Sequence, residues 1–217
     1  AKDKDTSEFV TGQFGVVYKP AENGSIYASY ATSATPPGNT LGEGSEGNPL
    51  GGGTVNNDLK PETTKNYEIG TKWDLLNDQL SLTADIFHTE KENARVQVNT
   101  NTYENAGKTR VQGVELSATG RITDKWQVFA GYAYMDSEQI DGGDMPLNRA
   151  NNGNELPNTP KNSASLWTTY QVLPRLTVGG GAFYVDDVFG NVANTTMVES
   201  YVRWDAMAAY KLTKNID

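Results

Sequence analysis

The sequence contains no cysteine among its 217 residues. A disulfide framework, a zinc–thiolate site, an iron–sulfur cluster and a thiol nucleophile are therefore excluded. Histidine is almost as scarce, because His88 is the only one, so no histidine cluster can bind a metal ion. A G-x-S-x-G motif and a metal-ligand set are also missing, and we expect no catalytic residue and no enzyme activity.

Long apolar runs and an excess of positive charge are missing as well. No run of about 18 apolar residues occurs, which excludes a transmembrane helix. The sequence has 18 Lys and Arg residues and 27 Asp and Glu residues, so the formal net charge is −9. Nucleic acid is excluded as a partner because phosphate binding requires a basic surface.

Only 36% of the residues are hydrophobic, a value that a transmembrane β-barrel can have because its strands alternate apolar and polar residues. Strict alternation is present in four segments. Their apolar rows are Tyr67, Ile69, Thr71, Trp73 and Leu75; Leu80, Leu82, Ala84 and Ile86; Trp126, Val128, Ala130, Tyr132 and Tyr134; and Val202, Trp204, Ala206, Ala208, Tyr210 and Leu212. This period of two predicts strands with one apolar and one polar face.

The alternating runs predict an all-β chain of about nine strands. We expect them at Glu8–Lys19, Ser25–Ala34, Asn66–Leu76, Gln79–Val98, Tyr103–Thr119, Lys125–Glu138, Asn162–Val172, Arg175–Asp186 and Glu199–Thr213. Tight turns and long polar connections alternate along the chain. That order is typical of an antiparallel up-and-down transmembrane β-barrel, with short turns at one rim and long loops at the other.

Aromatic residues gather near the expected strand ends beside the tight turns. They are Tyr18, Tyr27, Trp73, Trp126, Trp204 and Tyr210. Such rings concentrate where hydrocarbon meets water, so the pattern predicts an aromatic girdle at a membrane surface. The alternative is that they are ordinary aromatic residues of a soluble sheet.

Three segments, in this order and spacing, resemble the signatures of TonB-dependent outer-membrane receptors. The first, residues 59–73, reads LKPETTKNYEIGTKW and matches L-x-P-E-x-x-x-x-Y-E-x-G-x-K. The second, residues 104–116, reads ENAGKTRVQGVEL, and the third, residues 156–162, reads LPNTPKN. Residues 74–77 and 87–95 are most similar to the catecholate siderophore receptors within that family.

The resemblance implies a barrel of about 22 strands closed by a separate plug domain. The chain is too short for that, and it contains no plug, no signal peptide and no terminal aromatic strand. We therefore expect residues 1–217 to be part of the barrel domain, a fragment of its C-terminal half. Glu68 and Glu115 fall on the polar face, where the resemblance implies hydration or pairing with basic residues of the plug.

The resemblance also implies a function, which is uptake of a ferric siderophore across the bacterial outer membrane, driven through TonB. The siderophore is the transported ligand, and no covalently bound cofactor is expected. Because ferric siderophores are anionic and aromatic, basic and aromatic residues near the long loops are the expected contacts. They are Arg95, Tyr103, Lys108, Arg110 and Arg149. Lipopolysaccharide would surround the wall, and the receptor would be a monomer.

Three alternatives remain open from the residues alone. The same scaffold could take up another ligand, such as haem or cobalamin. The chain could belong to a passive porin, which would conduct ions steadily, or to a soluble β-sandwich or lectin-like binding module, which would need no detergent.

Overall fold

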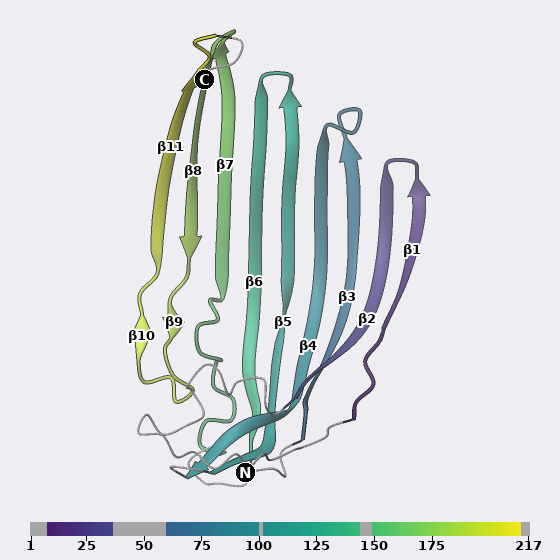
Figure 1. Cartoon of the computed structure of the whole chain (residues 1–217), viewed down its shortest axis with the longest axis vertical. Coiled ribbons are helices and arrows are strands. Elements are labelled where there is room, and N and C mark those ends of the chain that lie inside the picture. Colours follow the sequence, from purple (N-terminus) through teal and green to yellow (C-terminus); the bar gives the residue numbers. More distant parts are fainter. Residues whose placement is uncertain (1–7, 37–59, 100–101, 144–148, 214–217) are drawn as a thin grey trace, which may run out of the picture.

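The computed structural model of the chain describes residues 8–36, 60–99, 102–143 and 149–213 (Figure 1). Within these ranges the chain forms one large antiparallel sheet of nine strands in the order β1-β2-β3-β4-β5-β6-β7-β8-β11. The strands are β1 (Gln13–Ala21), β2 (Gly24–Thr35), β3 (Glu62–Leu75), β4 (Leu80–Asn99), β5 (Thr102–Thr123), β6 (Trp126–Gly142), β7 (Asn162–Leu173), β8 (Leu176–Val185) and β11 (Tyr201–Tyr210). The predicted all-β fold and its nine principal strands are confirmed.

Two short strands, β9 (Val188–Phe189) and β10 (Met197–Val198), pair with each other inside the connection from β8 to β11. Two residues are too few to show an alternation, so the sequence did not predict them. Some boundaries also differ from prediction. The first strand begins at Gln13 instead of Glu8, and β5 continues to Thr123, through residues expected to form a turn.

The connections separate into two groups at opposite ends of the sheet. Short turns join β1 to β2, β3 to β4, β5 to β6 and β7 to β8, and they all lie at the top of Figure 1. The turn after β3 is built from Leu76, Asn77 and Asp78, whose φ angles of 55°, 58° and 63° are the left-handed values that Asn and Asp tolerate well. The strand ends that the other connections join lie at the bottom, as the alternation of tight and long intervals predicted.

The pairing register assigns each side chain to one of two faces. Asp85 lies between Gly70 of β3 and Glu115 of β5, which places these three residues on one face, called the polar face here. Ile86 lies between Ile69 and Val114 on the opposite face, called the apolar face. Among the described residues, no hydrophobic side chain is buried. A soluble sandwich would cover its apolar face with a second sheet, and the described residues provide none.

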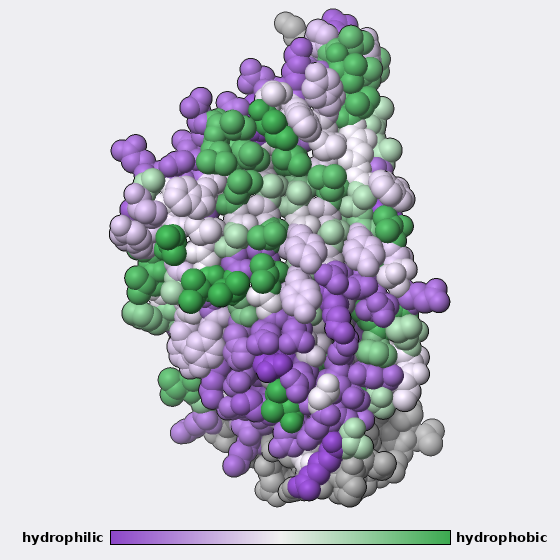
Figure 2. All heavy atoms as spheres, turned by 180° about the vertical axis from the view of Figure 1, so that it is seen from behind, coloured by the Kyte–Doolittle hydropathy of each residue, from purple (hydrophilic) through white to green (hydrophobic). Residues whose placement is uncertain are grey.

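The apolar face changes character along the strands. Figure 2 shows a face of the sheet on which hydrophobic side chains gather over the half near the short turns, while hydrophilic side chains dominate near the long connections. Tyr67, on the apolar face, is 47% exposed, and its ring lies 5.0 Å from the ring of Tyr30. Tyr132 and Tyr134 of β6 share this face and are also exposed. A tyrosine row thus lies between the hydrophobic and hydrophilic zones.

The predicted girdle beside the short turns needs two corrections. Trp73, Trp126 and Tyr210 lie at that rim, but Trp204 pairs with Ala182 in the middle of β8. Tyr27 pairs with Gly70, which places its side chain on the polar face instead of the apolar face. The β2–β3 register decides this position, and strand-end proximity alone cannot reveal it. Within the described ranges, no helix has the length and apolar character needed to cross a membrane.

Candidate functional site

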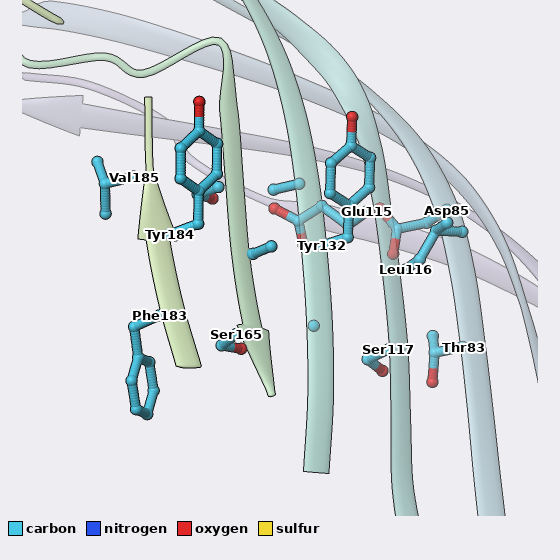
Figure 3. Close-up of a pocket in the computed structure, with 14 residues that line it drawn as sticks. Thr83, Asp85, Glu115, Leu116, Ser117, Tyr132, Ser165, Phe183, Tyr184 and Val185 are labelled. Atoms are coloured by element: carbon cyan, nitrogen blue, oxygen red, sulfur yellow. The ribbon is translucent and has the colours of Figure 1, made fainter. Parts of the chain in front are cut away.

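Three acidic residues from neighbouring strands come together on the polar face. They are Glu68 of β3, Asp85 of β4 and Glu115 of β5, and Asp85 and Glu115 are direct partners across the β4–β5 pairing. Figure 3 shows the carboxyl groups of Asp85 and Glu115 side by side. The Tyr27 hydroxyl donates a hydrogen bond of 2.7 Å to Oε1 of Glu68. This carboxylate cluster gives the polar face a negative surface suited to a basic partner.

Two motif glycines provide the space that this arrangement needs. A Cβ atom at Gly70 would lie 2.5 Å from the ring of Tyr27, so the missing side chain lets the Tyr27 ring lie over β3 and reach Glu68. A Cβ atom at Gly113 would lie 2.0 Å from the backbone oxygen of Tyr134. Both glycines therefore permit close approach in the wall.

Beside the carboxylate cluster the polar face is hollowed over β4 to β8. The hollow has a volume of about 540 Å³, and its lining includes Asp85, Glu115, Ser117, Ser165 and Phe183 (Figure 3). Its walls combine carboxylates, hydroxyls and the aromatic residues Tyr132, Phe183 and Tyr184. Among the described residues, no group of three or more acidic or histidine side chains is arranged to hold a metal ion. The lining of the hollow offers hydrogen-bonding and charged groups.

A network of ion pairs covers the apolar face beyond the tyrosine row, toward the long connections. Lys108 Nζ lies 3.0 Å from Glu90 Oε2, and Arg110 Nη2 lies 2.6 Å from Glu138 Oε2 and 3.5 Å from Asp136 Oδ2. Lys65 joins this network through Glu92, at 3.0 Å. The hydrogen bond from Lys108 is the main reason that the pKa of the Glu90 carboxyl is lowered. We call this network the exterior charged band.

The exterior charged band contains two of the predicted ligand contacts, Lys108 and Arg110. Both lie on the face opposite Glu115 and already have carboxylate partners. Counting alternate residues back from Glu115 would have placed Arg110 on this face from the sequence. His88 also lies here, with Nδ1 at 3.2 Å from Gln112 Oε1.

The other three predicted contacts lie at the long-connection end. Arg149 lies in the connection between β6 and β7, and its Nε donates a 3.3 Å hydrogen bond to the Gly143 carbonyl. Arg95 is in β4 and Tyr103 is in β5, near the tip of this hairpin. The side chains of Arg95 and Tyr103 lie outside the described part of the structure. The fold thus brings these backbone positions to one end of the sheet, and their contact with a ligand stays a prediction.

Sequence reasoning missed a group of asparagines that joins two long connections. Asn194 exchanges two hydrogen bonds with the backbone of Glu155, and the Asn158 N–H donates to the Phe189 carbonyl at 2.8 Å. A signal was present, since Asn158 lies inside the L-P-N-T-P motif. Asn158 and Asn194 both have positive φ angles, of 56° and 53°, which Asn adopts more readily than most residues.

Comparison with known proteins identifies relatives of the whole chain. The family model described as "TonB dependent receptor-like, beta-barrel" matches residues 1–217. The probable TonB-dependent siderophore receptor PiuA of Acinetobacter baumannii is 52% identical over 99% of this chain, which spans 29% of that protein. The catecholate siderophore receptor Fiu of Escherichia coli K12 is 36% identical over 94% of this chain, which spans 27% of that protein.

Solved structures of the same two receptors share the sheet. The crystal structure of the A. baumannii siderophore receptor PiuA superimposes with a TM-score of 0.86 at 52% identity, over 97% of this chain and 31% of that one. The closed form of E. coli Fiu gives a TM-score of 0.77 at 34% identity, over 94% and 29%. The open sheet is therefore a segment of a barrel wall. The chain belongs to the TonB-dependent receptor β-barrel family.

Proposed function

We propose that this chain forms part of the wall and extracellular loops of a receptor that takes up a ferric siderophore across the bacterial outer membrane. The observation that carries the proposal is the 52% identity to the probable siderophore receptor PiuA over nearly the whole chain. Similarity to Fiu supports a catecholate siderophore as the ligand. The chain spans less than a third of these relatives, so the proposal concerns the complete protein.

The two faces of the sheet support a transmembrane orientation. On the short-turn side of the tyrosine row the apolar face contacts lipid. The exterior charged band, on the other side of that row, lies at the level of lipid head groups and lipopolysaccharide. The polar face lines the lumen. The short turns then face the periplasm and the long connections face the cell exterior, which is where a ligand arrives.

In the proposed mechanism the loops, the wall and the partners that complete the receptor have separate roles. Extracellular loops capture the anionic iron chelate, and a plug domain closes the lumen until energy delivered through TonB releases the ligand inward. Arg95, Tyr103, Lys108, Arg110 and Arg149 are the proposed ligand contacts, because cationic and aromatic groups complement an anionic, aromatic chelate. Uptake requires binding and conformational change without covalent chemistry, so the protein acts as a monomeric receptor and not as an enzyme.

The carboxylate cluster supports the role of the wall in holding the plug. Glu68, Asp85 and Glu115 present negative charge to the lumen, and basic residues of a plug domain would neutralise it. An ion pair in the confined lumen is screened less by salt than one in open water. The cluster therefore favours a plugged receptor over a passive porin, whose lumen must stay open.

A growth experiment tests the proposal directly. A strain that lacks the gene is grown under iron limitation with one defined siderophore at a time, either a catecholate or a hydroxamate. We expect growth on a ferric catecholate to fail and to return when the complete gene is restored. If the deletion strain uses every siderophore as well as its parent does, the proposed function is wrong.

A binding experiment on the purified full-length protein separates the ligand classes. Ferric catecholate should quench its intrinsic fluorescence saturably in detergent, whereas haem and cobalamin should not. Steady ion conductance of the same protein in a planar bilayer would instead identify a porin.

A further inference from the structure

The side chain of Asn194 joins the connection from β8 to β11 to the connection from β6 to β7. Its Oδ1 accepts a hydrogen bond from the Glu155 N–H at 2.9 Å, and its Nδ2 donates to the Glu155 carbonyl at 2.9 Å. The amide side chain therefore satisfies the backbone donor and acceptor of Glu155 together, as a neighbouring strand would. We call this reciprocal pair the Asn194 clip.

Two further bonds run parallel to the Asn194 clip. Asn154 Nδ2 donates to the Val192 carbonyl at 2.9 Å, and the Asn158 N–H donates to the Phe189 carbonyl at 2.8 Å. The bonds are spaced along residues 154–158 on one side and 189–194 on the other. The two connections therefore meet along a short seam and not at a single point.

The same segment is also fixed to β6. The Gly153 N–H donates to the Gln139 carbonyl at 2.9 Å, and the Gln139 N–H donates to the Asn154 carbonyl at 2.9 Å. The Leu156 N–H donates to Ser137 Oγ at 3.1 Å. Gln139 and Ser137 are buried, with exposed fractions of 7% and 6%. Residues 153–158 are thus held between β6 and the β9–β10 hairpin.

The hairpin presents Asn194 in a fixed conformation. Asn191 Nδ2 donates to Thr195 Oγ1 at 2.8 Å, and the Thr195 N–H donates to Asn191 Oδ1 at 3.0 Å. The Asn194 N–H donates to the Asn191 carbonyl at 3.1 Å. These bonds hold the backbone of Asn194 at its positive φ and aim its amide at Glu155, so little side-chain entropy is lost in making the clip.

Arg149 lies at the near end of the held segment. Its carbonyl accepts a 3.1 Å hydrogen bond from the Asn152 N–H, and Asn152 Oδ1 accepts from the Gly142 N–H at 2.8 Å. The backbone of Arg149 is thus connected through one helical turn to the segment that the clip fixes. The clip at Glu155 and the bonds to β6 are therefore the contacts that together hold the segment that follows Arg149.

We infer that Asn194 is a positioning residue for ligand capture, because it joins two extracellular connections into one unit and sets the place of Arg149. This inference rests on the proposed function, in which Arg149 contacts the ferric siderophore. It adds that the β9–β10 hairpin contributes to affinity through Arg149 without touching the ligand.

The test uses the full-length receptor and the substitution Asn194→Gly, because glycine adopts the positive φ. It removes the clip together with the 3.3 Å hydrogen bond from Asn194 Nδ2 to the Asn191 carbonyl. Hydrogen exchange of the 153–158 segment should accelerate, since the Glu155 N–H loses its acceptor. The affinity for a ferric catecholate should fall about tenfold, the effect of losing one to two hydrogen bonds that order a binding loop. In an Arg149→Met background, the same substitution should change the affinity by less than about twofold.

A matched control is Val192→Ala, in the same hairpin, which shortens an exposed side chain and leaves the Asn191–Thr195 bonds, the Val192 carbonyl and both atoms of the clip in place. Its exchange rate at 153–158 and its affinity should match the wild type. Unchanged hydrogen exchange of residues 153–158 in Asn194→Gly would show that the Asn194 clip does not hold this segment. Equal losses of affinity with and without Arg149 would overturn the positioning role. Failure of the wild-type receptor to bind any ferric siderophore would refute the proposed function, and the exchange data would still report on the clip.

Discussion

Tyr27 of β2 donates a 2.7 Å hydrogen bond to Glu68 of the neighbouring strand β3, and its ring lies over Gly70, its pairing partner and the one residue of β3 without a side chain. This relationship explains the spacing of the Y-E-x-G segment in physical terms. Glu68 and Gly70 share a face because they are two residues apart, and the glycine opens the path to the glutamate.

The two motif glycines should differ in their tolerance of alanine. Gly70→Ala should lower the free energy of unfolding by about 1 kcal/mol, because the Tyr27 ring that blocks the new Cβ atom can move aside. Gly113→Ala should cost about 3 kcal/mol, because the obstacle is the Tyr134 backbone oxygen within the β5–β6 pairing. Urea unfolding of the full-length receptor measures both. Equal costs would contradict the difference between a movable ring and a fixed backbone.

The carboxylate cluster should hold the plug. Glu115→Gln removes one lumen charge with little change in shape, so the plug should release at lower urea concentration while the barrel unfolds at its usual midpoint. Conductance of the full-length receptor in a planar bilayer, measured against urea, reports the release. Ser117→Ala, on the same face and strand, is the control and should leave the release unchanged. If Glu115→Gln releases the plug at the same urea concentration as the wild type, Glu115 makes no ionic contact with the plug.

The face assignment predicts which tryptophans meet lipid. Trp73 shares the apolar face with Ile69, whereas Trp167 pairs with Gly181 on the polar face. In vesicles that contain brominated lipid, Trp73→Phe should decrease the quenchable fraction of the fluorescence, and Trp167→Phe should increase it. The opposite pattern would mean that the two faces are exchanged.

The five proposed ligand contacts should not contribute equally. Arg149→Met should weaken ferric catecholate binding about tenfold, as expected for a charged hydrogen bond. Lys108→Met and Arg110→Met should have smaller effects, because each cation is already paired with a carboxylate of the exterior charged band. Fluorescence titration gives the three affinities. A loss in Arg110→Met that exceeds the loss in Arg149→Met would reverse this order.

Asp186 should titrate at unusually low pH. Hydrogen bonds, first from Asn162 Nδ2 and then from the Tyr184 hydroxyl, lower the pKa of its carboxyl from 3.8 to about 2. Its contribution to stability is therefore complete above about pH 4 and is lost as the pH falls toward 2. Carbon-13 chemical shifts of labelled aspartate, assigned by comparison with Asp186→Asn, measure the pKa. Asn162→Ala should raise it, and an unchanged value would contradict the assigned cause.

The sequence by itself determined the strands, their two faces and the family. Alternation with a period of two is a local property, and turn residues mark where it stops, so nine strands and the order of short and long connections follow from the residues alone. The position of Glu68 and Glu115 on one face follows from the same period. Three motifs in register were sufficient to indicate the receptor family, which the family model confirms.

Only the tertiary structure decided which residues meet across the strands. The register between β2 and β3 placed Tyr27 over Gly70, and the register between β4 and β5 placed Lys108 beside Glu90. The seam between the two long connections depends on irregular backbone and on two-residue strands, which carry no period. Such contacts arise from the way distant segments are brought together, and for that reason the role of Asn194 emerged only from the folded chain.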